Sequence, residues 1–348
     1  MIRIALRDLQ FRRKRFVIAV LGASLVFAIS LVMTGLSASF DNEVDRTLDA
    51  VGAETWIVRS DAPGPFTSFA PIGLDSLAAV RAAGVADAAP LAAFLQSAGP
   101  LDDAVMINMF GVEPGAVGSP ADVDRGRPLA GPGEAVVGWG IDADLDDTIE
   151  MGGRTFTVVG RVDASQFGGQ PVVFVPLVDA QAVAFGGAPA FTVVVTAQEV
   201  ADAPAGLRAL DRADAAEDAL RPLQSAKDTI TAVRTVLWVV AALIIGSVMY
   251  LNALERTRDV AVFKAIGLST RFAAGGMALQ AVVLGLASSL LAVVFGALLA
   301  PLFPMRVEVP VQGYLLLPVV AVVTALVGSV AGVRRSVTVS PVVAFGGA

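Results

Sequence analysis

The segment Glu255–Arg271 reads ERTRDVAVFKAIGLSTR and is a short charged interval between two long apolar runs. Because each run is long enough to cross a bilayer, the simplest interpretation is a cytoplasmic connection between two transmembrane helices. The segment also has a helical pattern, since Val260, Phe263 and Gly267 share one face and charged residues occupy the rest. The residues alone leave two interpretations open: a helix that docks on a partner, or a basic loop that only obeys the positive-inside rule.

The segment resembles the cytoplasmic coupling helix of the FtsX/MacB-like permeases of ABC transporters, four-span, type VII-like and DevC-like members included. The usual form of that helix runs roughly E-R-x-R-E-I-(G/A)-x-x-(K/R)-A-(I/L)-G-A-(S/T). The matching positions are Glu255, Arg256, Arg258, Asp259, Val260, Ala261, Lys264, Ala265, Ile266, Gly267 and Ser269. Two departures are mild, since Asp259 stands for the commoner Glu and Leu268 for the commoner Ala.

The resemblance implies that this segment docks on a separate ABC ATPase subunit and transmits its movement across the membrane. The residues that it assigns to ATPase coupling are Glu255, Arg256, Arg258, Asp259, Val262, Phe263, Lys264, Ala265 and Gly267. ATP is then bound by the partner subunit, and we expect no cofactor in the chain itself. The sequence agrees, because it contains no Gly-x-x-x-x-Gly-Lys-(Ser/Thr) phosphate loop.

The composition indicates that part of the chain lies in lipid. Hydrophobic residues make up 55% of its 348 residues, and the mean hydropathy of +0.71 is too high for an ordinary soluble domain. The chain has no Cys and no His, which excludes disulfides, thiol or imidazole catalysis and the commonest metal ligand. A membrane-bound enzyme has little support, because no nucleophile and base constellation or metal constellation is visible.

The charge is divided between two parts of the chain. Asp41–Asp228 holds 28 acidic and 11 basic residues, a net charge of −17, and the remainder holds 4 acidic and 14 basic residues, a net charge of +10, which together give −7. This asymmetry predicts that the acidic block is translocated and that the basic flanks stay inside the cell. A nucleic-acid partner is disfavoured, because the basic residues adjoin membrane spans and form no independent folded face.

The N-terminal 15 residues interleave basic and apolar side chains. This pattern is typical of an amphipathic helix along the inner membrane surface, and equally of a plain topogenic anchor. The residues that would contact the membrane surface are Arg3, Arg7, Arg12, Arg13, Lys14 and Arg15. The next 21 residues, Phe16–Leu36, are apolar and reach roughly 32 Å as a helix, close to a hydrocarbon core of about 30 Å. A cleaved signal peptide is the competing interpretation, disfavoured because its apolar region usually has about 7–15 residues.

These patterns predict an α-helical membrane protein with four transmembrane helices and a mixed α/β extracytoplasmic domain between the first and second helices. The expected segments are an amphipathic basic segment at 1–15, the first span at 16–39, the extracytoplasmic domain with helical stalks at 40–228, the second span at 229–252, the coupling helix at 253–271, the third span at 272–300, an outer loop at 301–312, the fourth span at 313–333 and a cytoplasmic tail at 334–348.

Within the acidic block, short β-branched runs between Gly and Pro predict strands. The expected strands are Thr55–Val58, Val105–Phe110, Thr155–Val159, Val172–Val175 and Phe191–Thr196. We expect Leu74–Ala83 to be a helix of this domain and Phe40–Val51 to continue the first span as a stalk. Leu207–Lys227, rich in Ala and charged residues, is predicted to be a second helical stalk, kinked or started at Pro222.

Several phrases in the acidic block and the tail also resemble the same family. Phe110–Glu113 followed by Gly126–Leu129 is similar to its GV-(D/E)-P … L-x-x-G-R run, and Val173–Leu177 with Gln181 is similar to (V/I)-(F/Y)-V-P-L-x-x-x-Q. Ser340–Phe345 resembles the terminal x-P-x-x-A-L motif. Each phrase is weak alone, but their order extends the resemblance over almost the whole chain.

The apolar runs contain no Asp, Glu or Lys, and the only Arg is Arg234 near the outer start of the second span. Ion-coupled transporters usually need intramembrane ionisable groups, so this argues against a secondary transporter. Gly328 and Gly332 form a Gly-x-x-x-Gly pair that is typical of close helix contact, either within the chain or in a dimer, and we favour the former. The acidic run 142–147 lacks the spacing of a calcium loop and is interpreted as solvated surface.

We therefore expect the permease subunit of an ABC assembly that couples ATP hydrolysis by a separate ATPase to export, or to envelope lipid, lipoprotein or peptide handling, by mechanotransmission. The alternative is a signalling lever that transports nothing and regulates a cell-wall hydrolase or another envelope partner. Expected partners are the ATPase, a second permease copy or paralogue, membrane lipid and an envelope or periplasmic protein. The expected location is the bacterial cell membrane, with several spans, both termini in the cytoplasm and 40–228 outside.

Overall fold

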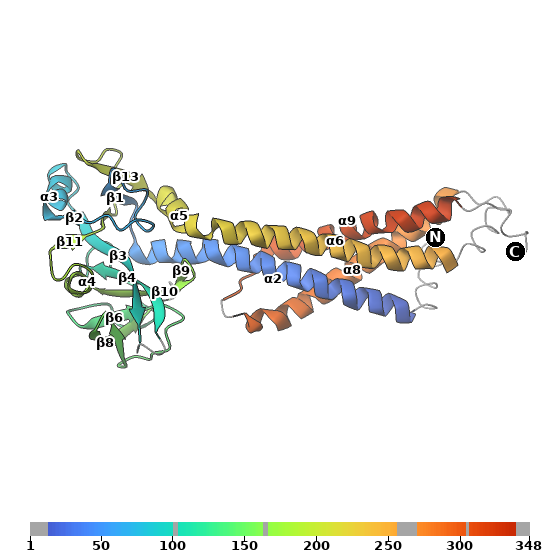
Figure 1. Cartoon of the computed structure of the whole chain (residues 1–348), viewed down its shortest axis with the longest axis horizontal. Coiled ribbons are helices and arrows are strands. Elements are labelled where there is room, and N and C mark those ends of the chain that lie inside the picture. The colour runs from blue at the N-terminus through green and yellow to red at the C-terminus, as the bar shows by residue number, and fades with distance from the viewer. Residues whose placement is uncertain (1–12, 100–103, 163–165, 256–269, 304–305, 339–348) are drawn as a thin grey trace, which may run out of the picture. The chain divides into compact units, whose positions relative to one another are not determined.

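Four helices in the described part of the chain are long and apolar enough to cross a membrane. The computed structural model describes residues 13–99, 104–162, 166–255, 270–303 and 306–338. The four helices are α2 (Arg13–Val51), α6 (Gln224–Glu255), α8 (Thr270–Leu299) and α9 (Val311–Thr338) (Figure 1). The chain divides into a helical unit, Met1–Ser39 with Ala226–Ala348, and an α/β domain, Phe40–Ser225. The domain is inserted between the first two helices, which confirms the predicted fold class.

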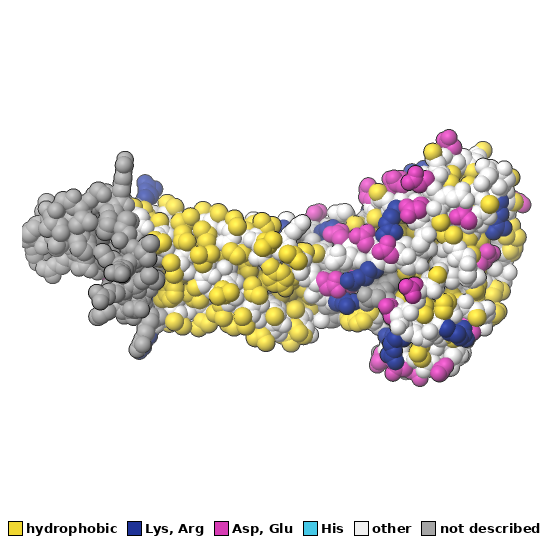
Figure 2. All heavy atoms as spheres, turned by 180° about the vertical axis from the view of Figure 1, so that it is seen from behind, with side chains coloured by type: hydrophobic (Ala, Val, Ile, Leu, Met, Phe, Trp, Pro, Cys, Tyr) yellow, Lys and Arg dark blue, Asp and Glu magenta, His cyan; other side chains and the backbone are white. Residues whose placement is uncertain are grey.

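The helical unit is packed through small side chains. Ala23, Ala241, Ala281 and Ala321 each come from a different helix and are completely buried at the centre of the bundle. Small residues let helix backbones approach closely. Within a membrane this close packing drives helix association, because lipid tails are as apolar as the helix surfaces and the hydrophobic effect therefore contributes little. Many large apolar side chains of α8 and α9, such as Leu290, instead point outward, and hydrophobic side chains cover this unit in Figure 2. This surface is the one that lipid would cover.

Helix α2 is longer than a membrane span requires. Its 39 residues correspond to about 58 Å, whereas a hydrocarbon core is about 30 Å thick. The additional length includes Phe40–Val51, which the sequence predicts to be a stalk, and the structure confirms that this segment is helical.

The α/β domain is built on one mixed sheet of eleven strands. Along the main path the order is β13 (Leu207–Asp211), β1 (Thr55–Arg59), β12 (Val193–Thr196), β3 (Ala89–Ala98), β4 (Val105–Val112), β10 (Gln170–Pro176), β6 (Glu134–Val137), β8 (Arg154–Arg161) and β5 (Arg125–Gly126). β7 (Thr148–Met151) pairs with β3 and β8, and β9 (Gln166–Phe167) pairs with β10. The pairs β4–β10 and β6–β8 are parallel, and the others are antiparallel. A separate two-stranded sheet joins β2 (Ile72–Gly73) and β11 (Ala190–Phe191).

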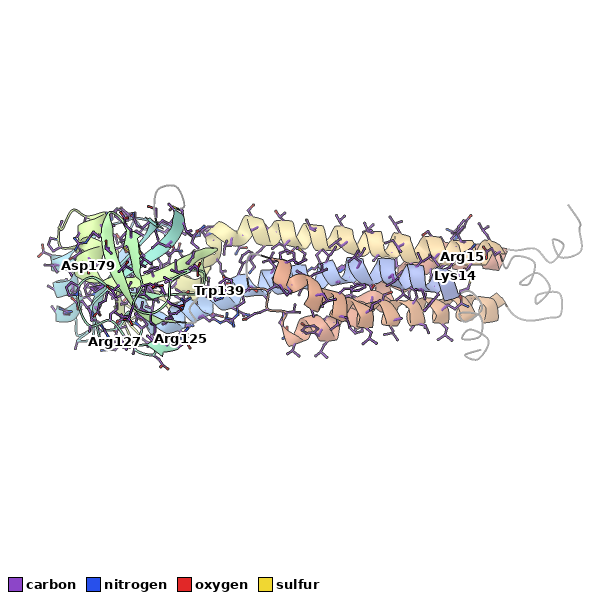
Figure 3. All side chains as sticks on the ribbon, turned by 90° about the horizontal axis from the view of Figure 1, so that it is seen from below. Lys14, Arg15, Arg125, Arg127, Trp139 and Asp179 are labelled. Carbon is purple, nitrogen blue, oxygen red and sulfur yellow. The ribbon has the colours of Figure 1, made fainter. Side chains whose placement is uncertain are left out.

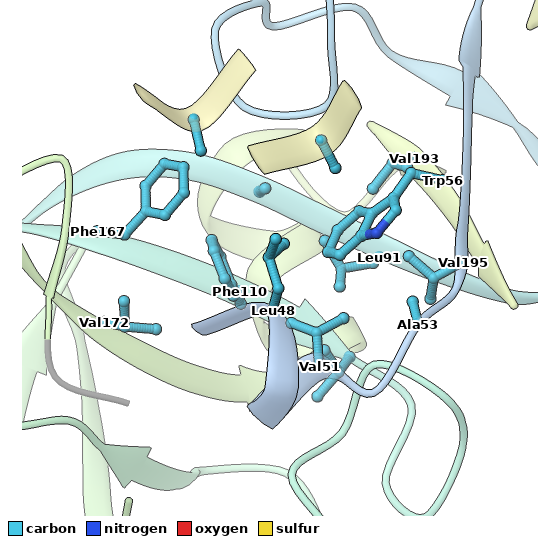
Figure 4. Packing of buried hydrophobic residues seen from close by; sticks show 14 of the residues in the cluster. Leu48, Val51, Ala53, Trp56, Leu91, Phe110, Phe167, Val172, Val193 and Val195 are labelled. Atoms are coloured by element: carbon cyan, nitrogen blue, oxygen red, sulfur yellow. The ribbon is translucent and has the colours of Figure 1, made fainter. Parts of the chain in front are cut away.

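Each face of the large sheet has its own hydrophobic core. On one face, Leu48 and Val51 at the end of α2 pack with Trp56, Leu91 and Phe110 (Figure 4). Residues of helix α5 (Arg212–Leu220) belong to this core too. On the other face, helix α4 (Leu177–Ala184) covers strands β3, β4 and β10, and Leu77 and Val80 of helix α3 (Leu74–Ala82) belong to the same core. The sheet is therefore buried on both faces, which explains why its central strands are almost continuously apolar.

The structure contains all five predicted strands and the predicted helix α3, with one interruption. The run Phe191–Thr196 is divided between β11 and β12. Thr192 separates them, because its hydroxyl accepts a hydrogen bond of 2.9 Å from the backbone N–H of Ala93 in β3. A side chain that bonds to the backbone in this way replaces a regular strand contact.

The second predicted stalk is partly wrong. Leu207–Asp211 forms the edge strand β13, which pairs with β1 from Thr55 to Arg59, so this part is extended and not helical. Helix α5 begins only after Asp211, whose side chain accepts a hydrogen bond of 2.7 Å from Asp214 N as an N-cap. A short 3₁₀ turn, η2 (Arg221–Leu223), contains Pro222 and precedes α6, as the sequence predicts for that proline.

Candidate functional site

Only the edges of the two predicted sites lie within the described residues. Glu255 is the last residue of α6, and the other predicted coupling residues, Arg256, Arg258, Asp259, Val262, Phe263, Lys264, Ala265 and Gly267, lie outside the described part of the chain. Of the predicted membrane-surface residues, Arg3, Arg7 and Arg12 also lie outside it, and Arg13 is the first residue of α2. Lys14 and Arg15 are exposed in the first turn of α2 (Figure 3).

An ion pair joins the beginning of α2 to the end of α6. Arg15 Nη1 donates to Glu255 Oε1, and both side chains remain partly exposed. The pair connects one residue from each predicted site, a connection that the sequence did not predict. Because both charges are solvated, the pair contributes only modestly to stability. It connects the first span to Glu255, the residue at which the predicted coupling segment begins.

Helix α9 is packed against α6 of the same chain through glycines. A Cβ added to Gly328 would lie 2.3 Å from the carbonyl oxygen of Ala242, and one added to Gly332 would lie 2.9 Å from the backbone of Met249. Neither position has room for a side chain. The glycine pair in the fourth span therefore serves packing within the chain, which is the alternative that the sequence analysis favours.

Two side-chain contacts join α2 to α6 farther along these helices. Trp238 Nε1 donates a hydrogen bond of 2.9 Å to Ser30 Oγ, and Arg234 Nη1 donates one of 3.4 Å to Thr34 Oγ1. The Arg234 guanidinium lies over the Trp238 ring, with its carbon 5.6 Å from the ring centroid. The sequence identified Arg234 as the one charge in the spans, but it gave no sign of these partners.

Helix α5 is anchored in the α/β domain by Asp218, a carboxylate that is 1% exposed. Its Oδ2 accepts hydrogen bonds from the backbone N–H groups of Phe66 and Thr67, at 2.9 and 3.1 Å, and its Oδ1 accepts one from the Thr67 hydroxyl. Gly64 makes this approach possible, because a Cβ there would lie 2.0 Å from the Asp218 carboxyl carbon. One buried carboxylate thus holds a whole loop against α5.

The loop that Asp218 holds brings an aromatic ring into the sheet core. The ring of Phe66 lies 5.0 Å from Trp56, 6.0 Å from Phe110 and 4.5 Å from Phe167, measured between centroids. These separations are typical of favourable aromatic pairs. A displacement of α5 would therefore act directly on the packing of β1, β4 and β9.

Arg212 joins the first turn of α5 to the stalk part of α2. Its Nη2 donates to Asp49 Oδ1 at 2.6 Å and to the backbone oxygen of Asp45 at 3.2 Å. The helix that enters the α/β domain and the helix that leaves it are thus held together inside that domain.

Other paired carboxylates have structural roles. Glu134 accepts hydrogen bonds from Arg127, at 2.6 and 3.0 Å, and from the backbone N–H groups of Ala130 and Gly131. The bonds with Arg127, helped by these backbone donors and opposed by burial, lower the pKa of Glu134 to about 2. Asp179, labelled in Figure 3, is 1% exposed and pairs with Arg154 at 2.9 Å. The hydrogen bonds and the ion pair of these groups fix loops of the α/β domain.

The acidic run 142–147 uses its charges locally. Asp147 Oδ2 accepts a hydrogen bond of 2.8 Å from Asp144 N. Asp144 Oδ1 lies 3.8 Å from Arg125 Nη1. Among the described residues, no group of three or more His, Cys, Asp or Glu side chains could hold a metal ion. The interpretation as surface carboxylates is consistent with this geometry.

Comparisons with known proteins cover both parts of the chain. The model of the MacB-like periplasmic core domain matches residues 16–213, and the model of the FtsX-like permease C-terminal domain matches residues 232–341. Proteins named as uncharacterized ABC transporter permeases in Mycobacterium bovis and Mycobacterium tuberculosis are 43% identical over 347 residues, 99% of each chain. A second Mycobacterium tuberculosis protein with that description is 42% identical over 345 residues, 99% of each chain.

One solved structure is also similar to part of the chain. It is the extracellular domain of the noncanonic ABC-type transporter YknZ from Gram-positive bacteria. The match has 15% sequence identity and a TM-score of 0.33, and it covers 46% of this chain and 99% of the other.

Proposed function

The chain belongs to the MacB/FtsX-like permeases of ABC transporters, and from this membership we propose that it converts ATP hydrolysis by a separate ATPase into a conformational change of its α/β domain. The ATPase would dock on the segment from Glu255 to Ser269. In this proposal the chain itself hydrolyses nothing, and the energy reaches it as a displacement of that segment.

The observation that carries the proposal is the continuity of the chain from Glu255 to the α/β domain. Helix α6 runs without a break from Gln224 to Glu255. Together with α5 and η2, which precede it, the helical path begins at Arg212. Its far end is held by Asp218 and Arg212, which contact a core loop and the stalk. We propose that α6 transmits an axial or tilting displacement along its length, because its backbone hydrogen bonds resist local bending.

The pair between Arg15 and Glu255 gives the same displacement a second path. A movement of the coupling segment would pull on α2 as well as on α6. Since α2 and α6 also meet at Ser30 with Trp238, we propose that the two helices move as a pair while α8 and α9 form their support. This is a shear or hinge motion of packed helices.

For orientation, we propose that both termini and the coupling segment face the cytoplasm and that 40–228 lies outside. The support is the net charge of −17 over Asp41–Asp228 and of +10 over the remaining residues, which follows the positive-inside rule. We further propose two permease copies, identical or related, on two ATPase copies. Export, or the handling of an envelope lipid, lipoprotein or peptide, is the proposed output.

A pull-down from native membrane with the chain tagged, followed by an ATPase assay of the recovered proteins, tests the proposal. We expect a phosphate-loop ATPase to be recovered with the wild-type chain and to be lost with the double variant Arg258→Glu, Lys264→Glu. Arg334→Glu is the matched control, because it reverses a basic charge that α9 exposes near its end and that lies outside the coupling segment. This control should retain the ATPase.

Two results would contradict the proposal. Recovery of no ATPase with the wild-type chain would remove the ABC coupling role, and normal docking and output in the double variant would show that the segment is not the coupling site. If the ATPase binds but deleting the α/β domain abolishes activation of a cell-wall hydrolase and alters no export, the output is signalling and not transport.

A further inference from the structure

Arg234 lies at a depth where a helix leaves the hydrocarbon core. It precedes Glu255 by 21 positions on α6, which corresponds to about 32 Å along a helix, compared with a core of about 30 Å. Its partner Thr34 follows Arg15 by 19 positions on α2, or about 29 Å. Since Arg15 pairs with Glu255, both helices place the contact between Arg234 and Thr34 at the opposite membrane boundary.

The surroundings of the guanidinium hold it in one orientation. The Trp238 ring beneath it is fixed by the hydrogen bond from Nε1 to Ser30, and Ser30 is 3% exposed. Thr34 donates its own hydroxyl hydrogen to the backbone oxygen of Ser30 at 3.0 Å, which leaves its oxygen free to accept from Arg234. A planar cation stacked on an aromatic face and held by one hydroxyl is a preorganised binding group.

The charge of Arg234 has no counter-charge among the described residues. Its Nε is buried and has no hydrogen-bond partner, and no carboxylate in the described part of the chain pairs with the side chain. Arg306 differs from Arg234, because its Nε lies 3.0 Å from Glu308 Oε1. A cation at a membrane boundary without a protein counter-charge is suited to an anion supplied by the membrane.

We infer that Arg234, stacked on Trp238 and bound by Thr34, forms a site for the phosphate group of a membrane phospholipid between α2 and α6. Arginine suits phosphate because two of its N–H groups can bind two phosphate oxygens in parallel. The apolar side chains that α6 exposes on the core side of Arg234, such as Val240, would contact the acyl chains. The site involves no residue of the coupling segment, so it stands independently of the proposed function.

Lipid titration of the purified, delipidated full-length chain in detergent tests this inference. The bound lipid is measured by native mass spectrometry for phosphatidylglycerol, for phosphatidylcholine and for a diacylglycerol with the same acyl chains and no phosphate. We expect the wild-type chain to bind both phospholipids at least fivefold more tightly than diacylglycerol. In Arg234→Gln this preference should disappear, whereas the matched control Arg306→Gln should keep it.

The other outcomes overturn the inference. Wild-type phospholipid affinity in Arg234→Gln would show that the guanidinium is not the binding group. Competition by inorganic phosphate at millimolar concentration would assign the site to a soluble anion and not to a lipid. If Arg234→Gln fails to fold, the wild-type comparison decides alone, since equal affinity for phosphatidylglycerol and diacylglycerol would exclude a phosphate site.

Discussion

A Cβ atom added to Gly328 of α9 would lie 2.3 Å from the carbonyl oxygen of Ala242 on α6. The two helices therefore touch backbone to backbone, and nothing larger than a hydrogen atom fits at this position. The contact fixes the distance between the fourth span and the helix that continues into the α/β domain.

We expect Gly328→Ala to destabilise the chain, because the added methyl group meets rigid backbone and the helices must separate. Overpacking of this kind costs about 1–3 kcal/mol, which thermal unfolding of the full-length chain in detergent would detect. Gly276→Ala on α8 is the matched control, since no atom lies within 4 Å of its added Cβ. That variant should be neutral or up to about 1 kcal/mol more stable, because alanine favours a helix over glycine. Equal effects of the two variants would contradict the packing argument.

Removal of the Asp218 carboxylate should loosen the loop that carries Phe66. Asp218→Ala leaves the N–H groups of Phe66 and Thr67 without their protein acceptor, and because both contacts are only partly buried the loss should amount to about 1–3 kcal/mol in total. We expect faster proteolysis within 61–70 and a lower unfolding temperature. Glu217→Ala, one residue earlier on the exposed side of α5, should change stability by no more than about 0.5 kcal/mol. Unchanged proteolysis in Asp218→Ala would refute the anchoring role.

Glu134 should make the domain sensitive to acid. Its pKa is lowered from 4.5 to about 2, mainly by the hydrogen bonds with Arg127. A depressed folded-state pKa stabilises the protein above pH 4.5, and this contribution is lost as the pH falls towards 2. Because Arg127 is half exposed, solvent screening keeps the contribution to stability well below the one that the pKa shift alone would suggest.

The measurement for Glu134 is unfolding of the full-length chain as a function of pH. Glu134→Gln should be less stable than wild type at pH 7, and its stability should depend less on pH between 4.5 and 2. Glu150→Gln, which alters an exposed carboxylate of β7, should follow the wild-type curve. A Glu134→Gln curve parallel to wild type would mean that the native pKa is ordinary.

Charge exchange at Arg15 and Glu255 tests whether their pair couples the first two spans. Either single reversal, Arg15→Glu or Glu255→Arg, places like charges together and should reduce ATP-dependent output severalfold. The double reversal restores the pair and should recover most of that output. ATPase stimulation and output are measured together in vesicles, because a pure docking defect lowers both and a transmission defect lowers only output. If the double variant does not recover the ATP-dependent output, Glu255 acts only through its contact with the ATPase subunit and not through Arg15.

The features that the sequence predicts well are those that depend on local pattern. Span length, hydropathy and β-branched runs between Gly and Pro identify the four helices and five of the strands, because each of these signals lies within one segment. Leu207–Asp211 was predicted to be helical because its surroundings are rich in Ala and charged residues. Pairing with β1, with Leu210 opposite Trp56, makes the segment a strand, so tertiary contact overrides local propensity.

The contacts on which the proposed function depends could not be predicted, because they join distant parts of the chain. Arg15 and Glu255 are separated by 240 positions, and Phe66 and Asp218 by 152. A single sequence contains no signal that selects these two pairs among all other possible pairs of polar groups. The coupling motif was recognised from its resemblance, and most of it lies outside the residues that the structure describes.

The contact of Arg212 with Asp49 and with the backbone of Asp45 also makes the α/β domain a module that can be transplanted. Its entry and exit are neighbours, so a graft into a foreign helical hairpin would need no long linkers. The same proximity would allow the excised piece to be closed into a ring by a short peptide. Evolution could likewise exchange this domain as one unit while the membrane helices stayed unchanged, so that the same helical unit would carry different α/β domains.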